Sequence, residues 1–347
     1  MNIFDLVSAK EIAVYVKSNP SLVVPYLGAT LFPSKKKLGL DLAWFKGSKG
    51  LPVALMPSEF DAKATLRDRI GFTRVETEMP FFREAMRIGE KDRQELLKVK
   101  EAGEEYYLTL VNDIYDDVTN LVGGAEVQAE RMRMQLLSTG KIAIMANRMS
   151  YDYNYNFDVN HKESLAGDAR WSQIELATPI TDIQDWQDTV ESDTGTRPNK
   201  AVCTKKTWNY LLTNKSIRLD MNPIGGQNII MTDAMLKQYL STKLGLSVAV
   251  YNKKYKIQDG STYQFFPDEV FTLIPDGNLG NTYFGTTPEE ADLMSGETEA
   301  QVQIVNTGVA ITTKKEVHPV NVETIVSAIT LPSFETIDDI FIATVHS

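Results

Sequence analysis

The sequence has little of the residue types on which covalent and metal chemistry depend. Its single cysteine, Cys203, excludes an intramolecular disulfide and a multi-cysteine metal site within one chain. The three histidines lie far apart, at His161, His318 and His346. Only His161 has an acid, Asp158, at the spacing of a helical metal site, and this stretch is predicted as strand or loop. We therefore predict no metal site and no catalytic histidine.

Motifs for nucleotide or acyl chemistry are also missing. The sequence holds no G-x-S-x-G elbow, no Walker-type phosphate loop and no G-x-G-x-x-G, and "GSKG" is too short to wrap a phosphate. Adjacent acids occur at Asp116-Asp117, Glu289-Glu290 and Asp338-Asp339. Neighbouring side chains on a helix or strand point in different directions, so these pairs predict solvated faces or turns. We predict no catalytic residue, no cofactor and no enzymatic activity.

Long apolar runs and an excess of positive charge are absent as well. No stretch approaches the roughly 18 apolar residues of a spanning helix, and Asp5 lies where a signal peptide would be basic, so we expect synthesis inside the cell without a membrane partner. The net charge is −10 and the pI near 5, which argues against a protein that coats phosphate. The lysines at 35–37 predict a solvated loop without a ligand.

The composition is that of a folded chain. Hydrophobic residues make up 43% and charged residues 24% of 347 residues, enough for two domains or one large domain with insertions. Residues 1–36 predict an arm, with a short helix over Ile3 to Tyr15 and prolines after it. From Leu38 to Met79, near-alternate β-branched and aromatic residues fenced by glycine and proline predict a long two-stranded ribbon.

The pattern after Pro80 is helical. Apolar residues at three- and four-residue spacing predict a long helix from about Asp92 to Leu121, which stops at Gly123-Gly124. A second helix follows and ends at Gly140, a predicted C-terminal glycine cap, and a tyrosine-rich strand comes after it.

The second half mixes helices and strands. One predicted helix points Ile183 and Trp186 inward, and the segment after it predicts a strand that runs into another helix. A capped helix, a hairpin with Asp259-Gly260 at its turn and the buried strand "EVFTLIP" follow, and strands close the chain from Gln301. The large aromatics Trp44, Phe45, Trp171 and Trp208 are predicted to lie in the core or at an interface. These elements predict an α+β protein.

The order of these elements resembles a known family. The arm, the ribbon, the long helix, "LLSTGK" followed by a strand, Trp171 shortly before "PITDIQDW", and "FFPDEVFTLIP" before "GNTYFGTTPEEADLM" are similar to the lambda-type major capsid proteins of tailed bacteriophages. This family is often called phage capsid protein E. The likeness covers nearly the whole chain. It implies an HK97-like fold in which the arm and the ribbon, called the E-loop, reach across neighbouring subunits.

The resemblance also implies a division into domains. It places the arm at 1–36, the E-loop at 37–79, a peripheral domain at 80–170 and 301–347 with a spine helix at about 92–121, and an axial domain at 171–300. A two-stranded ribbon is marginal alone, so a neighbouring subunit would supply its missing core. The candidate contact residues are Leu51, Val53, Leu55, Met56, Phe60, Leu66, Arg67, Arg69, Ile70, Phe72 and Arg74.

The implied function is that of a structural subunit of an icosahedral phage head. The resemblance implies pentamers and hexamers that enclose double-stranded DNA without sequence-specific binding, assembled in the host cytoplasm into the virion. Because the arm begins almost at Met1, we expect a separate scaffolding protein beside the portal, with room for a decoration protein. Lys46 and Lys49 lie where some relatives form an isopeptide cross-link, but no partner asparagine or acid can be placed, so we expect no cross-link.

Two alternatives stay open at this point. The same fold also forms encapsulin-type cellular compartments, which an enzyme cargo in place of phage DNA would distinguish. A soluble enzyme or ligand-binding protein built on 171–300 would require a compact monomer with a pocket, and its ribbon would then be a loop without a role.

Overall fold

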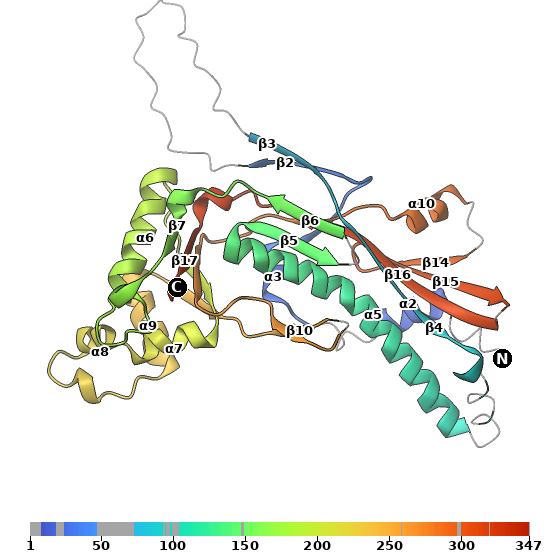
Figure 1. Ribbon diagram of the computed structural model, residues 1–347, viewed down its shortest axis with the longest axis horizontal. Helices are drawn as coiled ribbons and strands as arrows, with labels where there is room; N and C mark the ends of the chain where they lie inside the picture. Colours follow the sequence, from blue (N-terminus) through green and yellow to red (C-terminus); the bar gives the residue numbers. More distant parts are fainter. Residues whose placement is uncertain are drawn as a thin grey trace, which may run out of the picture. The chain divides into compact units, whose positions relative to one another are not determined.

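The computed structural model divides the chain into two compact units (Figure 1). It describes residues 8–18, 24–46, 73–92, 94, 98, 104–146, 149–257, 259–296, 300–318 and 320–346. The first unit comprises residues 1–42, 76–132 and 281–333. The second unit comprises residues 43–75, 133–280 and 334–347. Each unit is thus assembled from segments that are far apart in the sequence.

The first unit is built on a six-stranded sheet. Its strands are, in order, β1 (Ser34–Lys36), β13 (Thr282–Phe284), β16 (Val320–Pro332), β15 (Val309–Val317) and β14 (Gln301–Val305), with β4 (Phe81–Ile88) also paired to β16. Only β1 and β13 run parallel; the other pairs are antiparallel. Most of β16 is buried because it lies between paired strands, and β-branched residues favour such positions.

The helix α2 (Ala9–Ser18) covers part of this sheet. Its buried residues recur at three- and four-residue spacing and join a core with Val118 and Val122 of helix α5 and with Val305 and Ile311 of the sheet. The predicted helix over Ile3 to Tyr15 therefore exists but extends to Ser18, and its first residues lie outside the described part. The short helix α3 (Leu27–Leu31) follows it.

Two predictions about the segment after Pro80 are wrong. The residues directly after Pro80 form strand β4, which pairs along its whole length with β16. The long helix does not stop at Gly123-Gly124: α5 runs without interruption over Glu104–Thr139. Each glycine costs a helix about 1 kcal/mol relative to alanine, and burial of Val122 and Ala129 on either side of the pair offsets this cost.

The second unit is built on a five-stranded sheet. The strand order is β7 (Lys162–Ser164), β17 (Phe341–Thr344), β12 (Val270–Ile274), β8 (Lys200–Cys203) and β9 (Ser247–Val250). The predicted buried strand "EVFTLIP" is the central strand β12, in which every residue is buried. The outer pairs, β7 with β17 and β8 with β9, are parallel, and the inner pairs are antiparallel.

Helices pack on this sheet around an aromatic core. The helices are α6 (Pro179–Thr194), α7 (Lys205–Thr213), α8 (Lys215–Met221) and α9 (Asp233–Leu244). The ring of Trp171 lies 5.7 Å from that of Trp186 and 5.1 Å from that of Phe271. Ile183 and Trp186 point inward as predicted. On α9, the predicted caps are confirmed: the Thr232 side chain accepts from the amide of Met235, and left-handed Gly245 ends the helix.

Three two-stranded hairpins complete the described chain. They are β2 (Asp41–Lys46) with β3 (Thr73–Glu78), β5 (Lys141–Ala146) with β6 (Met149–Asn154), and β10 (Lys254–Lys256) with β11 (Thr262–Gln264). Gly140 ends α5 at φ 74°, where an added Cβ would lie 2.6 Å from Phe157 Cβ, so the predicted glycine cap is confirmed. Short 3-10 helices occur at Val159–His161, Gly167–Ala169, Gly226–Asn228 and Ile337–Asp339.

Candidate assembly surfaces

The base of the predicted ribbon is the β2–β3 pair. Most of the candidate contact residues lie outside the described residues: Leu51, Val53, Leu55, Met56, Phe60, Leu66, Arg67, Arg69, Ile70 and Phe72. The backbone of Arg74 lies in β3, but its side chain is outside the described part. The same holds for the side chain of Lys46 in β2, and Lys49 is wholly outside. The contact role of these residues stays a prediction.

Trp44 anchors β2 in the second unit. Its side chain is buried, and its ring lies 5.3 Å from that of Tyr155. Burial raises the pKa of Tyr155 well above its usual value, with the nearby Tyr153 and Glu335 adding to the shift. Within the described residues, the indole Nε1 of Trp44 has no hydrogen-bond partner. Trp44, Trp171 and Trp208 are all buried, as predicted for core or interface anchors.

The arm helix α2 is fixed to its own unit by polar contacts at both ends. The amide of Ala9 donates to Oγ1 of Thr313 at 3.1 Å. The hydroxyl of Tyr15 donates to Asp116 at 2.8 Å, and its ring stacks on Tyr115 at 5.1 Å. The hydrogen bond to Asp116 is the main reason that the pKa of Tyr15 is raised. The helix of the predicted arm therefore contributes to the core of its own subunit.

The helix α10 (Pro288–Ser295) is held to the sheet of the first unit by two ion pairs. Glu289 pairs with Arg83 of β4, and Glu290 pairs with Lys36 of β1. Lys36 also donates to the carbonyl of Gly285 at 2.9 Å. The adjacent acids point to different partners, as expected for neighbours on a helix. Their side chains are only 14% and 12% exposed, so the predicted solvated face is wrong for this pair.

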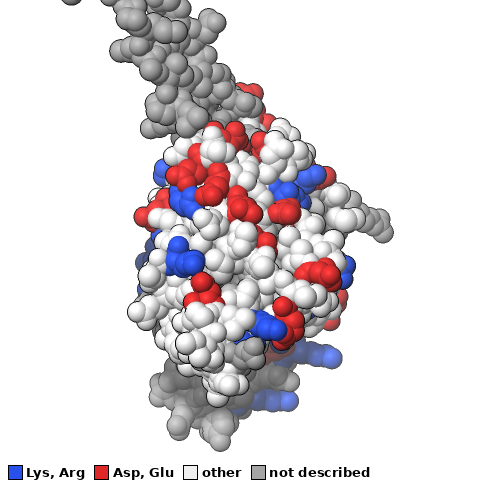
Figure 2. All heavy atoms as spheres, turned by 90° about the vertical axis from the view of Figure 1, so that its left-hand side faces the viewer, with Lys and Arg blue, Asp and Glu red and all other residues white. Residues whose placement is uncertain are grey.

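One face of α6 is acidic. Its acids are Asp182, Asp185, Asp188, Glu191 and Asp193, and the helix contains no lysine or arginine. Because Ile183, Trp186 and Val190 occupy the buried stripe, most of these acids face solvent. Figure 2 shows the side of the molecule on which α6 lies in Figure 1, and acidic side chains gather in its upper part.

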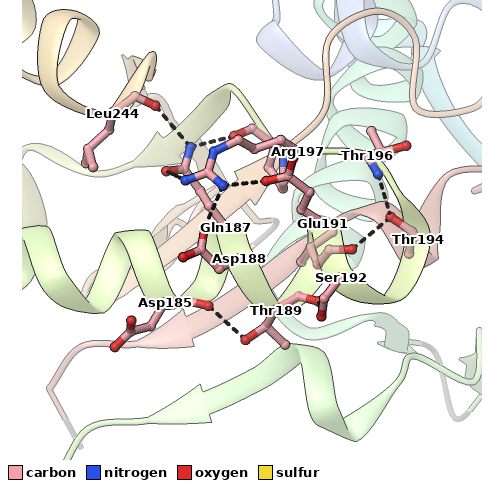
Figure 3. Close-up of polar contacts among 12 residues, drawn as sticks. Asp185, Gln187, Asp188, Thr189, Glu191, Ser192, Thr194, Thr196, Arg197 and Leu244 are labelled. Carbon is pink, nitrogen blue, oxygen red and sulfur yellow. Dashed lines mark hydrogen bonds and ion pairs between the residues drawn. The ribbon is translucent and has the colours of Figure 1, made fainter.

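A single arginine bridges two of these acids beyond the C-terminal end of α6 (Figure 3). The guanidinium of Arg197 contacts both Asp188 and Glu191, and its Nη2 donates to Oε1 of Gln187 at 3.4 Å. Gln187 is fully buried, and its amide donates to the carbonyls of Pro198 at 2.7 Å and of Leu244 at 3.4 Å. This network ties the end of α6 to the end of α9.

His161 lies in the core of the second unit. Its Nε2 is 3.3 Å from Oδ2 of Asp193, and Asp158 caps the 3-10 helix instead of facing the histidine. Nearby, Asp339 is only 8% exposed, so the predicted solvated position of this acid is wrong. Burial raises the pKa of Asp339, against a hydrogen bond from Thr194 and the nearby His161. Among the described residues, no group of histidine, cysteine and acidic side chains could hold a metal.

Sequence reasoning missed two charged features of the second unit. The acids of α6 recur at three-residue spacing, a signal that could have predicted an acidic helix face. Lysines flank the aromatic residue of β10, Tyr255, and their density around a predicted hairpin was a second signal. Cys203, in contrast, is buried, and burial raises its pKa to about 12, so it is not a reactive thiol.

These features define a class of protein. The α+β fold and the base of the ribbon agree with the class predicted from the sequence, a structural subunit of a shell. The chain belongs to the family of phage major capsid protein E, whose model matches residues 8–345. This membership favours a phage shell over a cellular compartment or an enzyme.

Solved structures support the same fold. A putative capsid protein of an Escherichia coli CFT073 prophage aligns with a TM-score of 0.59 and 13% identity, over 97% of this chain and 99% of that one. A phage-related protein from Bordetella bronchiseptica RB50 has a TM-score of 0.53 at 13% identity, covering 97% of both chains. The capsid of cyanophage A-1(L) has a TM-score of 0.51 at 10% identity, over 94% of this chain and 93% of that one.

These matches confirm the predicted HK97-like fold. No curated protein sequence matches the chain. In the described part of the structure, no helix is both long and apolar enough to cross a membrane.

Proposed function

We propose that this capsid subunit forms pentamers and hexamers of an icosahedral head, and that its ribbon lies on a neighbouring subunit. The family match over residues 8–345 is the observation that carries the proposal. Trp44 supports the proposal, because its buried indole anchors β2, which is part of the base of the predicted ribbon. A two-stranded ribbon is marginal alone and gains stability when a neighbour covers one face.

Within the proposal, the candidate contact residues supply apolar anchors and a charged rim. The side chains of Arg67, Arg69 and Arg74 would surround the apolar anchors. The anchors, which would be buried on the neighbour, are Leu51, Val53, Leu55, Met56, Phe60, Leu66, Ile70 and Phe72. Shell interfaces combine apolar centres with polar rims, so that each contact is modest and many contacts together are stable.

The head would enclose double-stranded DNA without sequence-specific contacts. A subunit with net charge −10 supports this, because a lining that gripped phosphate would oppose packaging and release. The proposal includes a separate scaffolding protein, a portal and assembly in the host cytoplasm. It also allows a decoration protein on the outside.

Electron microscopy and sedimentation velocity on the chain, alone and with its neighbouring phage genes, test the proposal. We expect rings or closed shells from the wild-type chain and their loss when residues 46–80 are deleted. A second variant, Ile70→Asp with Phe72→Asp, keeps the ribbon length and should also lose assembly. The control, Ser58→Asp, lies in the same ribbon outside the contact residues and should assemble. A wild-type chain that stays monomeric under every condition contradicts the proposal.

A further inference from the structure

The second unit carries opposite charges on two of its elements, the acidic helix α6 and the lysine-bearing β10–β11 hairpin. β7 and β9 are the edge strands of the five-stranded sheet. With strands spaced about 4.8 Å apart, these edges lie about 19 Å from one another. The acidic helix α6 lies across this sheet. The indole of Trp186 donates to Glu163 in β7, and the amide of Gln187 donates to the carbonyl of Leu244, which closely precedes β9. The β10–β11 hairpin follows directly after the edge strand β9 in the chain.

The β10–β11 hairpin presents lysines without acidic partners. Strand alternation puts Lys254 and Lys256 on one face of β10, and both side chains are exposed. Their cross-strand neighbours are Gln264 and Thr262, which carry no charge. In the described part of the chain neither lysine forms an ion pair, and the same is true of exposed Lys205, whose amide is bound to Asn252 beside the hairpin.

Aromatic contacts join the hairpin to the sheet. Tyr255 stacks on Tyr263 with 5.8 Å between the rings and lies 4.9 Å from the ring of Phe265. Phe265 is buried and lies 6.4 Å from Tyr251, which follows β9. The aromatic face therefore joins the hairpin to the sheet edge, and the lysine face is left for another partner.

The acids of α6 are only partly neutralised within the chain. Arg197 serves both Asp188 and Glu191, whose side chains remain 56% and 47% exposed. Asp185 is exposed and, among the described residues, has no cationic partner. The exposed face of α6 is therefore negative.

We propose that the lysine hairpin of one subunit contacts the acidic face of α6 on the next subunit, and that this contact repeats around each capsomer. A ring built head to tail needs two different complementary patches on each copy. Lys254 and Lys256 would meet the helix face that bears Asp185. The inference rests on the proposed assembly into capsomers and identifies two of the surfaces that form them.

A second copy of this chain fits the hairpin better than DNA does. The chain itself supplies a matching negative face on α6, and complementary potentials favour the correct partner and orientation. A DNA-binding surface would ordinarily form a broader basic face. Here Asp259 lies at the turn of the same hairpin, and the chain as a whole has a net charge of −10.

Charge reversal tests the contact. The hairpin variant is Lys254→Glu with Lys256→Glu, and the helix variant is Asp185→Lys with Ser192→Lys, both on exposed side chains. The control is Lys91→Glu with Lys237→Glu, at exposed positions elsewhere in the chain. It changes the net charge by the same amount as the hairpin variant does. Sedimentation velocity at low salt measures the concentration at which half of the subunits assemble. We expect each test variant to raise it about tenfold or more and the control to leave it unchanged.

An equal mixture of the two test variants shows most directly whether the hairpin and α6 contact each other. In a six-membered ring the variants can alternate, so that each junction pairs opposite charges again. In a five-membered ring, one junction must join two copies of the same variant. We therefore expect the mixture to recover six-membered rings and to form five-membered rings poorly.

The outcomes separate this inference from the proposed function. A wild-type chain that never assembles overturns both. A wild-type chain that assembles, together with test variants that assemble equally well, overturns the hairpin contact alone. If the hairpin variant assembles normally but no longer binds a DNA duplex that the wild type binds, the hairpin contact is overturned. The lysines would then bind phosphate.

Discussion

The two units differ in which of their charged side chains have partners within the same unit. In the first unit, acids of α10 pair with Lys36 and Arg83 of the same unit, and Tyr15 of the arm helix binds Asp116. In the second unit, the lysines of β10 face uncharged cross-strand neighbours, and two acids of α6 share one arginine. Local ion pairs hold the peripheral elements of the first unit in place. The second unit also has local ion pairs, such as Lys206 with Glu269, but its β10 lysines remain for another copy to meet.

Breaking the core contact of α2 should have the largest effect. Ile12 is fully buried between helix and sheet in the first unit, so Ile12→Ala leaves a cavity and should lower the free energy of unfolding by about 3 to 4 kcal/mol. Val14→Ala, on the exposed face of the same helix, should change it by less than about 0.5 kcal/mol. Urea denaturation of unassembled subunits measures both. Equal effects would show that α2 is not seated in its own core.

Gly285 tests how tightly the first unit is packed. A Cβ at this position would lie 2.7 Å from Cγ2 of Ile329, 2.8 Å from the carbonyl of Gly39 and 2.9 Å from Cε of Met79. Gly285→Ala should therefore destabilise by about 2 to 3 kcal/mol in thermal or urea unfolding.

Gly123 is the matched control for this substitution. An added Cβ there meets nothing within 4 Å in the middle of α5. Gly123→Ala should stabilise by about 0.5 to 1 kcal/mol, because alanine favours the helix. A loss of stability in this variant would contradict a continuous α5.

Asp339 gives the second unit a pH dependence of definite sign. Its folded pKa is raised, mainly by burial, so the folded state holds its proton more strongly than the unfolded state does. The contribution of this group to stability should be present below the unfolded pKa near 3.8 and be lost as pH rises through the raised folded pKa. Asp339→Asn should remove this loss, so the variant should gain stability relative to wild type as pH rises from about 4 to 7.

Urea unfolding of wild type and Asp339→Asn across that pH range measures the difference. Comparing the two chains cancels the titration of the other carboxylates. The control is Asp168→Asn, which removes one carboxylate at an exposed position of the same unit and reports any general effect of lost charge. A difference between wild type and Asp339→Asn that stays constant with pH would contradict the burial of this carboxyl.

Arg197 should have the smallest effect. Its side chain is 36% exposed, and its partners Asp188 and Glu191 are more exposed, so solvent screens the ion pairs. Arg197→Met should lower stability by only about 0.5 to 1 kcal/mol in thermal unfolding. Lys215→Met, which removes the pair with Glu175 in the same unit, is the matched control and should have a similar or smaller effect.

Much of the local structure could be predicted from the sequence, because caps, turns and helix faces depend on residues that are close in the chain. The cap at Gly140, the turn at Asp259-Gly260 and the inward positions of Ile183 and Trp186 depend on neighbours within a few residues. Strand β4 could not be predicted, because "FFREAMRI" has helix-forming residues and becomes a strand only by pairing with β16.

The candidate surfaces were predictable only in part. The ribbon and its contact residues follow from composition and resemblance, and they lie outside the described residues. No prediction was made from the sequence for the acidic face of α6 or for the lysines of β10. Their relation appears only in the fold, which joins the helix and the hairpin to one sheet.

Cross-linking within assembled particles tests the central claim most directly. Particles are assembled from equal amounts of light and heavy-isotope subunits, treated with an amine-reactive cross-linker and digested for mass spectrometry. A link between two subunits then yields mixed-isotope peptides. We predict mixed-isotope links from Lys49 in the ribbon to lysines of a neighbouring subunit. Links from Lys49 that join only peptides of one isotope would contradict the proposal that the ribbon lies on a neighbouring subunit.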